Sequence, residues 1–523
     1  MPRISRHEPA GARVRFHAPL MGLVAAGLAL APVGCGVDKT KFSSPQVELV
    51  VSSAELAVLE GEQVTFTIAL SARPTAPVLV AVSSSAETKV AGAPVELEFS
   101  PDAFDVAQTV TLTGVVDRDF NNETATITVE AEAIEPATLT VSVIECPTLA
   151  AQDFWLMFNP NNAGGGRREV HVAGAAGTLV SIAGAPAAPI PAAGILMVDT
   201  GLTRVPAPNV VESGKAFQVT ASAPVQVFAN NYVPNTVDAF TAVPLQLLGT
   251  DYRALGFSTS RQSQITVYAT EDNTTVTIGT DAAIKLNRGQ SYLRTSAADV
   301  TGVRVVSDKP VGVNTGDACI NTGAGACDHV EEMLFPVNSW ASDFFVPVIP
   351  QSQVFRVVAA SDATVVSVDG AEVRTLNVGQ FYEGSGGGKR VQASKPVEVY
   401  IIGMGEPTGN GDPAFILIPG VQNAVDEATF SALAADNENT LVVSMPTADI
   451  GTLRLDGAAI TPAPTWTAYA SGGYSHTRIP VTAGIHTLIA GKPFIPIVWG
   501  ERSFESYGYV AGYGYPRAAC QLP

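Results

Sequence analysis

The chain is poor in charged residues and in histidine, and both shortages limit the kinds of binding partner and catalytic site that it can have. Only 15% of its 523 residues are Asp, Glu, Lys or Arg, and six are His. The formal net charge of −19 argues against nucleic acid as a binding partner and against electrostatic docking on anionic lipid. Apolar residues make up 46% of the chain, which is enough for large cores, and the length predicts two to four domains.

Recognisable catalytic motifs are also missing. The sequence contains no G-x-S-x-G, no H-E-x-x-H and no phosphate-binding loop. No window keeps a helical period, so we expect few and short helices. Short Val- and Thr-rich runs between Gly, Pro, Asp and Asn predict instead an all-β protein.

The N-terminus predicts export. Four arginines precede the apolar run Leu20 to Gly34, which is shorter than the ~20 residues of a transmembrane helix. Cys35 follows Val-Gly and resembles the acylated cysteine of bacterial lipoproteins, although Pro32 stands where Leu is usual. We therefore expect a signal peptide over 1–34, a lipid on Cys35 and a tether over 35–45. The lipid would hold the protein in the outer membrane, facing the periplasm or the cell surface. An ordinary secretory signal is the alternative.

Four cysteines remain after Cys35, and export into an oxidising compartment favours disulfides. Cys319 and Cys327 are close in sequence and are predicted to pair, which leaves Cys146 with Cys520. The latter bond would tie the ends of the segment between them and suggests a closed, ring-like arrangement. The alternative is that Cys146 and Cys520 are unpaired or form intermolecular bonds.

Residues 46–145 alternate with period two in about seven short strands, the pattern of an immunoglobulin-like β-sandwich. The segments LEGEQVTFTIALS, VELEFSPDAF and QTVTLTGVVDRDF resemble Calx-beta domains. That resemblance implies a calcium site, for which Glu60, Glu62, Asp117 and Asp119 are the matching acids. Solvated turn acids are the alternative.

Residues 146–523 contain an internal repeat of roughly 90 residues. Four segments of strand, small or polar turn, Pro and strand align, beginning at Val219, Arg304, Arg390 and Leu488. Each of the last three is preceded by an apparent hairpin, such as ITVYATEDNTTVTIG. We predict about four repeated β units, arranged as tandem sandwiches or like a propeller.

Several motifs of this region occur in a specific order, among them VDAFTAVPLQLLGTDYRALGF, VTGVRVVSDKPVGVNTGDACI and ACDHVEEMLFPVNSWASDFFVPVIP. Together they resemble the IgGFc-binding N-terminal domain family, from about Asp153 to at least Gly403. The resemblance implies an extracellular, non-enzymatic adhesion or binding module. It does not imply that this chain binds IgG.

Two stretches are candidate sites. In DACINTGAGACDHVEE, the spacing of Cys327 and His329 does not match a zinc site, so we predict a stapled loop. Asp328 and His329 then either anchor that loop through hydrogen bonds to the backbone or face a partner. In the tail SFESYGYVAGYGYP, Tyr507, Tyr509 and Tyr513 either form a binding face or seal a core.

The predicted function is therefore recognition or adhesion at the surface of a bacterial cell, with an extracellular protein or a glycan as partner and with no cofactor except the candidate calcium. An all-β carbohydrate-active hydrolase is the first alternative, because Asp238, Asp328 and Glu332 have the carboxylates that it would need. A passive structural spacer is the second.

Overall fold

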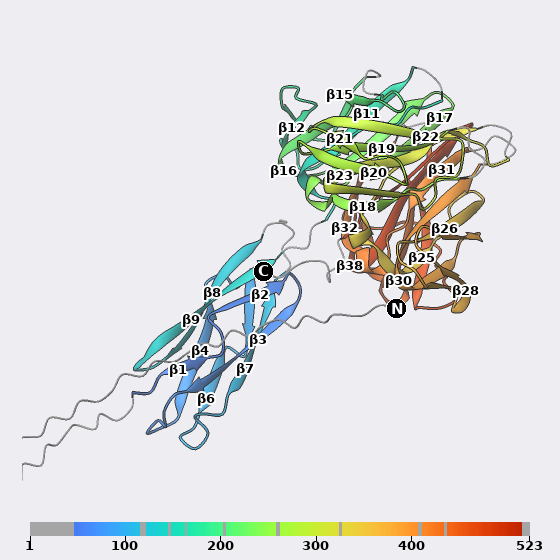
Figure 1. Cartoon of the computed structure of the whole chain (residues 1–523). Helices are drawn as coiled ribbons and strands as arrows, with labels where there is room; N and C mark the ends of the chain where they lie inside the picture. Colours follow the sequence, from blue (N-terminus) through green and yellow to red (C-terminus); the bar gives the residue numbers. More distant parts are fainter. Residues whose placement is uncertain are drawn as a thin grey trace, which may run out of the picture. The chain divides into compact units, whose positions relative to one another are not determined.

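The structure is a computed structural model and describes residues 46–115, 122–144, 148–162, 165–201, 205–257, 262–323, 327–405, 411–433 and 437–514. Nearly all regular structure in these ranges is β, as predicted (Figure 1). The helices are short 3₁₀ turns at Leu245–Leu247 (η2), Val337–Ser339 (η3), Val421–Asn423 (η4) and Thr447–Thr452 (η5). No helix in the described part is long and apolar enough to cross a membrane.

The first nine strands form two sheets, ordered β1-β3-β7-β5 and β2-β9-β8-β4-β6. Alternate residues of these strands are buried, and Phe66, Phe99 and Ile127 belong to a core built from this segment alone. The period-two pattern of the sequence thus corresponds to two facing sheets. The strands are β1 (Leu49–Val51), β2 (Glu55–Leu59), β3 (Gln63–Leu70), β4 (Val78–Ser84), β5 (Val90–Ala93), β6 (Glu96–Phe99), β7 (Gln108–Gly114), β8 (Glu123–Ala131) and β9 (Ile134–Ile144).

The repeat region consists of four units that share a topology of seven strands. The fourth unit has one additional short strand, β36 (Thr467–Ala468), which pairs with β37 (Tyr474–Val481) and is left out when the shared strands are counted. In each unit one long strand pairs with the first, second, third and seventh strands, the second pairs with the fifth, and the third pairs with the fourth. The long strands are β16 (Phe217–Val233), β23 (Arg304–Ile320), β30 (Lys389–Met404) and β38 (Gly484–Arg502). They contain the four segments that align in the sequence, so the predicted repeat is structural.

The remaining strands of the four units follow the chain order. The first unit has β10 (Ala151–Leu156), β11 (Arg167–Ala173), β12 (Leu179–Ile182), β13 (Ala188–Pro189), β14 (Ile195–Asp199) and β17 (Thr236–Thr241). The second has β18 (Gly249–Arg253), β19 (Ser263–Ala269), β20 (Thr274–Ile278), β21 (Ile284–Leu286), β22 (Gln290–Ser296) and β24 (Asp328–Met333), and β15 (Val211–Ser213) joins its sheet. The third has β25 (Ala341–Val346), β26 (Gln353–Ala359), β27 (Thr364–Val368), β28 (Ala371–Leu376), β29 (Phe381–Ser385) and β31 (Pro413–Leu417). The fourth has β32 (Val425–Ala432), β33 (Glu438–Pro446), β34 (Arg454–Leu455), β35 (Ala458–Ala459), β36 (Thr467–Ala468), β37 (Tyr474–Val481) and β39 (Glu505–Val510).

Two local predictions were wrong in the same way. The small or polar turn before each repeated Pro is a bulge within one continuous strand, where the register with the first strand shifts, for example between Gly249 and Asp251. The apparent hairpin at 265–279 is an arch, because β19 and β20 both pair with β23 and not with each other. Bulge and arch both carry the chain from one sheet to the other, which makes each unit a small sandwich and not a flat propeller blade.

The four units meet through their seventh strands. β17 lies against β24, β24 against β31, β31 against β39, and β39 against β17. Every residue of these four strands is buried. First and fourth units also share core contacts, such as the Phe228 and Tyr509 rings, whose centroids are 4.9 Å apart. The arrangement of units is therefore closed, although Cys146 and Cys520 lie outside the described residues.

Candidate functional site

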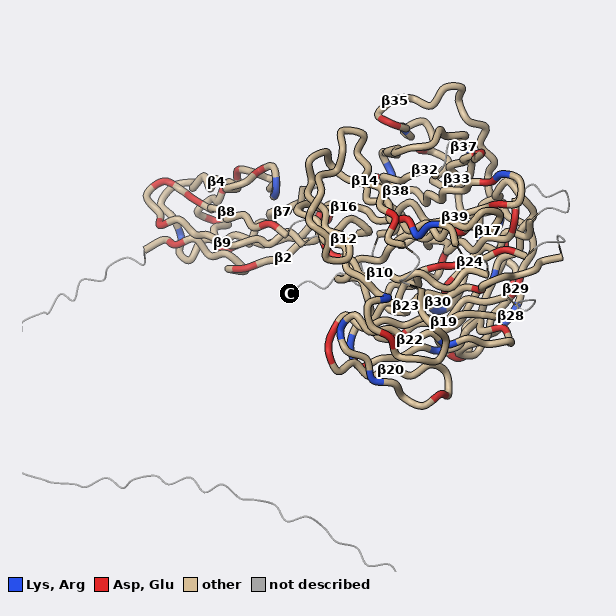
Figure 2. Tube along the Cα trace, turned by 90° about the horizontal axis from the view of Figure 1, so that it is seen from above, with Lys and Arg blue, Asp and Glu red and all other residues tan. Residues whose placement is uncertain are grey.

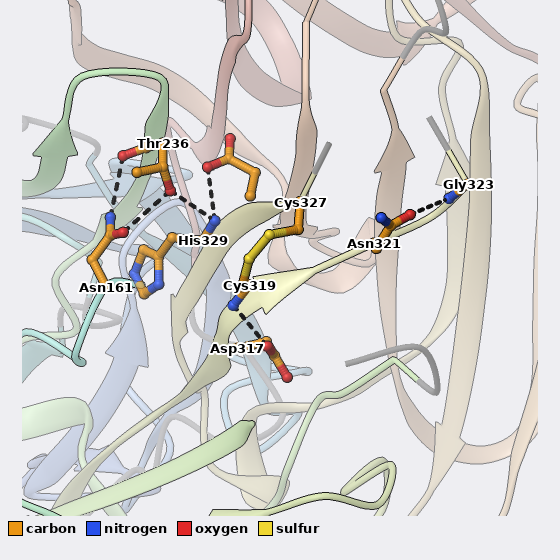
Figure 3. The surroundings of a disulfide bond; sticks show 9 residues. Asn161, Thr236, Asp317, Cys319, Asn321, Gly323, Cys327 and His329 are labelled. Carbon is orange, nitrogen blue, oxygen red and sulfur yellow. Dashed lines mark hydrogen bonds between the residues drawn. A yellow bond between two sulfur atoms is a disulfide. The ribbon is translucent and has the colours of Figure 1, made fainter. Parts of the chain in front are cut away.

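The cysteine stretch forms a stapled loop, as predicted. Cys319 lies near the end of β23 and Cys327 just before β24, and a disulfide joins them with a Cα–Cα distance of 5.1 Å, within the usual range (Figure 3). The Asp317 side chain accepts a hydrogen bond from the Cys319 amide. The disulfide thus closes the connection between the long strand and the seventh strand of the second unit.

Asp328 and His329 follow the disulfide and lie inside the protein. Both side chains are fully buried. The Nε2 atom of His329 is 3.0 Å from Asn231 Nδ2 and 3.3 Å from Glu331 Oε2, while its backbone amide donates to Thr236 Oγ1. The ring therefore contacts side chains and not the backbone that we expected. Of the two interpretations of this pair, burial favours the anchor of the loop over the contact with a partner.

Asp238 occupies the place where the four units meet. Its Oδ2 accepts hydrogen bonds from the backbone amides of Glu331 at 3.0 Å and Phe415 at 3.4 Å. Its Oδ1 accepts from Ala239 at 2.9 Å and Gly508 at 3.4 Å. One carboxyl group thus receives an amide from β17, β24, β31 and β39. Burial raises the pKa of Asp238 well above its ordinary value, and the four amides act in the opposite direction.

Other acids near this centre are equally enclosed. Glu331 accepts from the Asn159 amide and from Asn314 Nδ2, and Glu332 accepts from the Leu417 amide. Burial raises the pKa of Asp328 and of Glu332 well above their ordinary values. A glycosidase needs its two carboxylates in a groove that admits a sugar. The acids that suggested a hydrolase, Asp238, Asp328 and Glu332, are at most 2% exposed.

The tyrosines of the tail also lie in the core. Tyr507 donates to Asn439 Oδ1, and Tyr513 donates to the Ser339 carbonyl. The Tyr513 ring stacks on Phe335 with centroids 3.7 Å apart. Burial raises the pKa of Tyr507. Of the two interpretations of the tail, these contacts favour a segment that seals the core. They do not favour a tyrosine binding face.

The candidate calcium acids are only half described. Glu60 and Glu62 lie in the turn between β2 and β3, whereas Asp117 and Asp119 lie outside the described residues. Within the described ranges, no three His, Cys, Asp or Glu side chains form a cluster that could hold a metal ion. The calcium site remains a prediction.

Several residues with strong contacts were not predicted. Asn159, Asn231 and Asn314 form a buried polar network with Glu331 between the first and second units. Arg356, which is 3% exposed, joins the second and third units. Their only sequence signal is a polar residue within or just after an apolar strand, and this signal does not distinguish a buried network from an exposed face.

Asp412 should make the stability of the folded protein depend on pH. Burial, and then the charge of Glu505, raise its pKa to about 6. The folded state therefore holds a proton that the unfolded chain releases near pH 4, so stability is full below that pH and falls as the pH rises through 6. In thermal or urea unfolding, Asp412→Asn should match the wild type at pH 4 and exceed it by about 1 to 2 kcal/mol at pH 8, allowing for screening by solvent. Equal stability at pH 8 would contradict this assignment.

Comparison with known proteins identifies the module. A model of the family "IgGFc binding protein" matches residues 238–500. The human IgGFc-binding protein is 26% identical over an alignment of 326 residues. The alignment covers 55% of this chain and 6% of the human protein, so the chain spans only a small part of that relative.

Solved structures give only distant similarities. A Bacteroides ovatus GH5 xyloglucanase matches with 20% identity and a TM-score of 0.15, over 23% of this chain and 22% of that enzyme. An ICAM-5 ectodomain fragment matches with 9% identity and a TM-score of 0.16, over 68% and 94% of the two chains. Scores this low carry no argument about fold or function. The family match does. It covers half of the chain, from the last strand of the first unit through the second and third units and into β38 of the fourth. The chain belongs to the IgGFc-binding protein family.

Proposed function

We propose that this chain is a non-enzymatic recognition protein whose four-unit module binds an extracellular protein. The observation that carries the proposal is the family match over 238–500, together with the human relative named for binding the Fc part of IgG. The enclosed acids agree with it, because side chains that no substrate reaches cannot act on one. A hydrolase has no such support, and a passive spacer does not account for the family match.

Binding to purified proteins tests this function. The exported chain is immobilised, and human IgG Fc is the first probe, with Fab, serum albumin and a glycan array beside it. We expect an extracellular protein, Fc first, to bind with a Kd in the micromolar range or tighter. Binding of glycans alone would assign the module to carbohydrate recognition. Absence of any protein binding would contradict the proposal.

We further propose that a lipid on Cys35 holds the protein at a bacterial outer membrane, so that the module faces the periplasm or the cell surface and acts in adhesion. The basic, apolar and Cys-terminated N-terminus supports this location. Globomycin, which blocks lipoprotein signal processing, should accumulate the unprocessed chain, and Cys35→Ala should release the protein from membranes. Normal processing under globomycin would indicate an ordinary secretory signal.

A further inference from the structure

An exposed aromatic residue occupies a strained turn at the end of the fourth unit. β38 and β39 are joined by Ser503 and Phe504 alone, and Phe504 has a φ of +57° with 47% of its surface exposed. Left-handed backbone is unfavourable for a bulky side chain. Because the ring is half exposed, the fold gains little from it in return. A costly residue that the core does not need suggests a role outside folding.

The first unit contains a matched turn. There β16 and β17 are joined by Pro234 and Asn235, and Asn235 has a φ of +62°. Asn tolerates the left-handed region far better than Phe does. The same hairpin in the same scaffold is thus built with an ordinary turn residue in one unit and with a phenylalanine in another.

The two hairpins lie side by side. The Asn235 amide donates to Glu505 Oε1 at 2.9 Å, and Arg502 Nη2 donates to Tyr232 Oη at 3.1 Å. The Arg167 guanidinium lies 4.5 Å from the centre of the Tyr232 ring. We call Arg167, Tyr232, Pro234, Arg502 and Phe504 the hairpin patch. Tyr and Arg are the residues that most often dominate the energy of protein interfaces, and Phe is enriched there.

The charges of the hairpin patch are balanced. Arg167 pairs with Glu169 at 2.7 Å, and Arg502 pairs with Glu505 at 2.7 Å. Acidic and basic residues accordingly lie together beside β39, on a chain whose net charge is −19 (Figure 2). A locally neutral surface does not select its partner by charge. It suits a partner that binds mainly through packing. The partner that fits is a protein that presents an apolar surface to the Phe504 ring and acceptor groups to the arginines.

We propose that the hairpin patch is the surface through which the module docks on its protein partner, with Phe504 as the anchoring side chain. The inference rests on the proposed recognition function and assigns it to one edge of the contact between the first and fourth units. Since the patch is neutral, binding should change less than threefold between 50 and 500 mM NaCl.

The substitution Phe504→Asn tests the anchor, because it copies the turn of the first unit. We expect binding to weaken at least tenfold, while the thermal midpoint stays the same or rises as the strain is relieved. A structural role of Phe504 would lower the midpoint instead. Val378→Asn is the control: Val378 is 48% exposed in the third unit, and its removal should change neither property.

Two probes separate this inference from the proposed function. Human IgG Fc is one, and the other is a phage library of random 12-residue peptides selected on the wild-type protein. Peptides whose affinity falls tenfold in the Phe504→Asn variant support the hairpin patch, whether or not Fc binds. If Fc does not bind, only the choice of Fc as the partner is wrong. The inference is wrong if no peptide is enriched, or if peptides or Fc bind both proteins equally. It is also wrong if Phe504→Asn only abolishes self-association in sedimentation, since the occupant would then be a second copy.

Discussion

Asp238→Ala should destabilise the repeat module by about 4 kcal/mol, although it removes only one side chain. The substitution leaves four amides in the buried centre without their acceptor, and two of those bonds are 2.9 and 3.0 Å long. Each buried donor without a partner costs about 1 to 3 kcal/mol, and the two longer bonds contribute less. Urea unfolding followed by tryptophan fluorescence measures the loss. We expect a broader transition as well, because the four units would no longer share one hydrogen-bonded centre.

Two variants give this result its meaning. Asp238→Asn keeps the shape but turns an NH₂ group toward amide donors, so it should fall between alanine and the wild type. Asp281→Ala removes an acid that is 42% exposed and pairs with Arg294, and it should cost less than about 1 kcal/mol. If Asp238→Ala unfolds within 1 kcal/mol of the wild type, Asp238 does not hold the units together.

Arg356→Ala should cost about 3 to 5 kcal/mol, through the contact between the second and third units. Arg356 lies in β26 and donates to the Gly256 carbonyl, to Thr301 and to Asp299, with distances of 2.8 to 2.9 Å. The guanidinium also packs on the rings of Phe381 at 4.3 Å and Phe257 at 5.0 Å. The Arg356 side chain is 3% exposed and that of Asp299 is 19% exposed, so the substitution leaves a largely enclosed carboxylate without its counter-charge, which is costly.

Arginine and lysine should differ at this position. A lysine ammonium has three donors where the guanidinium has five, and it lacks the planar face that stacks on the two rings, so Arg356→Lys should still lose about 2 kcal/mol or more. Arg304→Ala is the matched control, because Arg304 is 53% exposed and pairs with Asp251 at the surface. Equal unfolding midpoints for the Arg356→Ala and Arg304→Ala variants would show that Arg356 does not join the units.

The repeat shows which structural features sequence patterns predict and which they do not. Period-two alternation and a recurring Pro predicted the four repeated β segments, although not that each is one continuous long strand, because both patterns depend on neighbours along the chain. The same patterns suggested hairpins where the structure has bulges and arches. A polar turn between two strands has the same sequence pattern whether the strands pair with each other or lie in facing sheets. Which strand pairs with which depends on contacts between residues far apart in sequence.

The candidate sites differ for the same reason. Cys319 and Cys327 are eight residues apart, so their pairing was evident from the sequence alone. Asp238, Glu331 and Gly508 are brought together by the closure of four units, and no local sequence pattern predicts that contact. Likewise, Tyr507 and Tyr509 alternate as an exposed strand would, and only the packing of the seventh strands buries them.

The sequence by itself thus determined the all-β class, the fourfold repeat, the local disulfide and the family, all of which are encoded in composition, short periods and ordered motifs. The tertiary structure alone decided which acids are enclosed, which arginines join units and which aromatic ring is left outside. The physical reason is that burial is a property of the assembled units: a carboxylate or a phenyl ring carries the same local signal on either side of the surface.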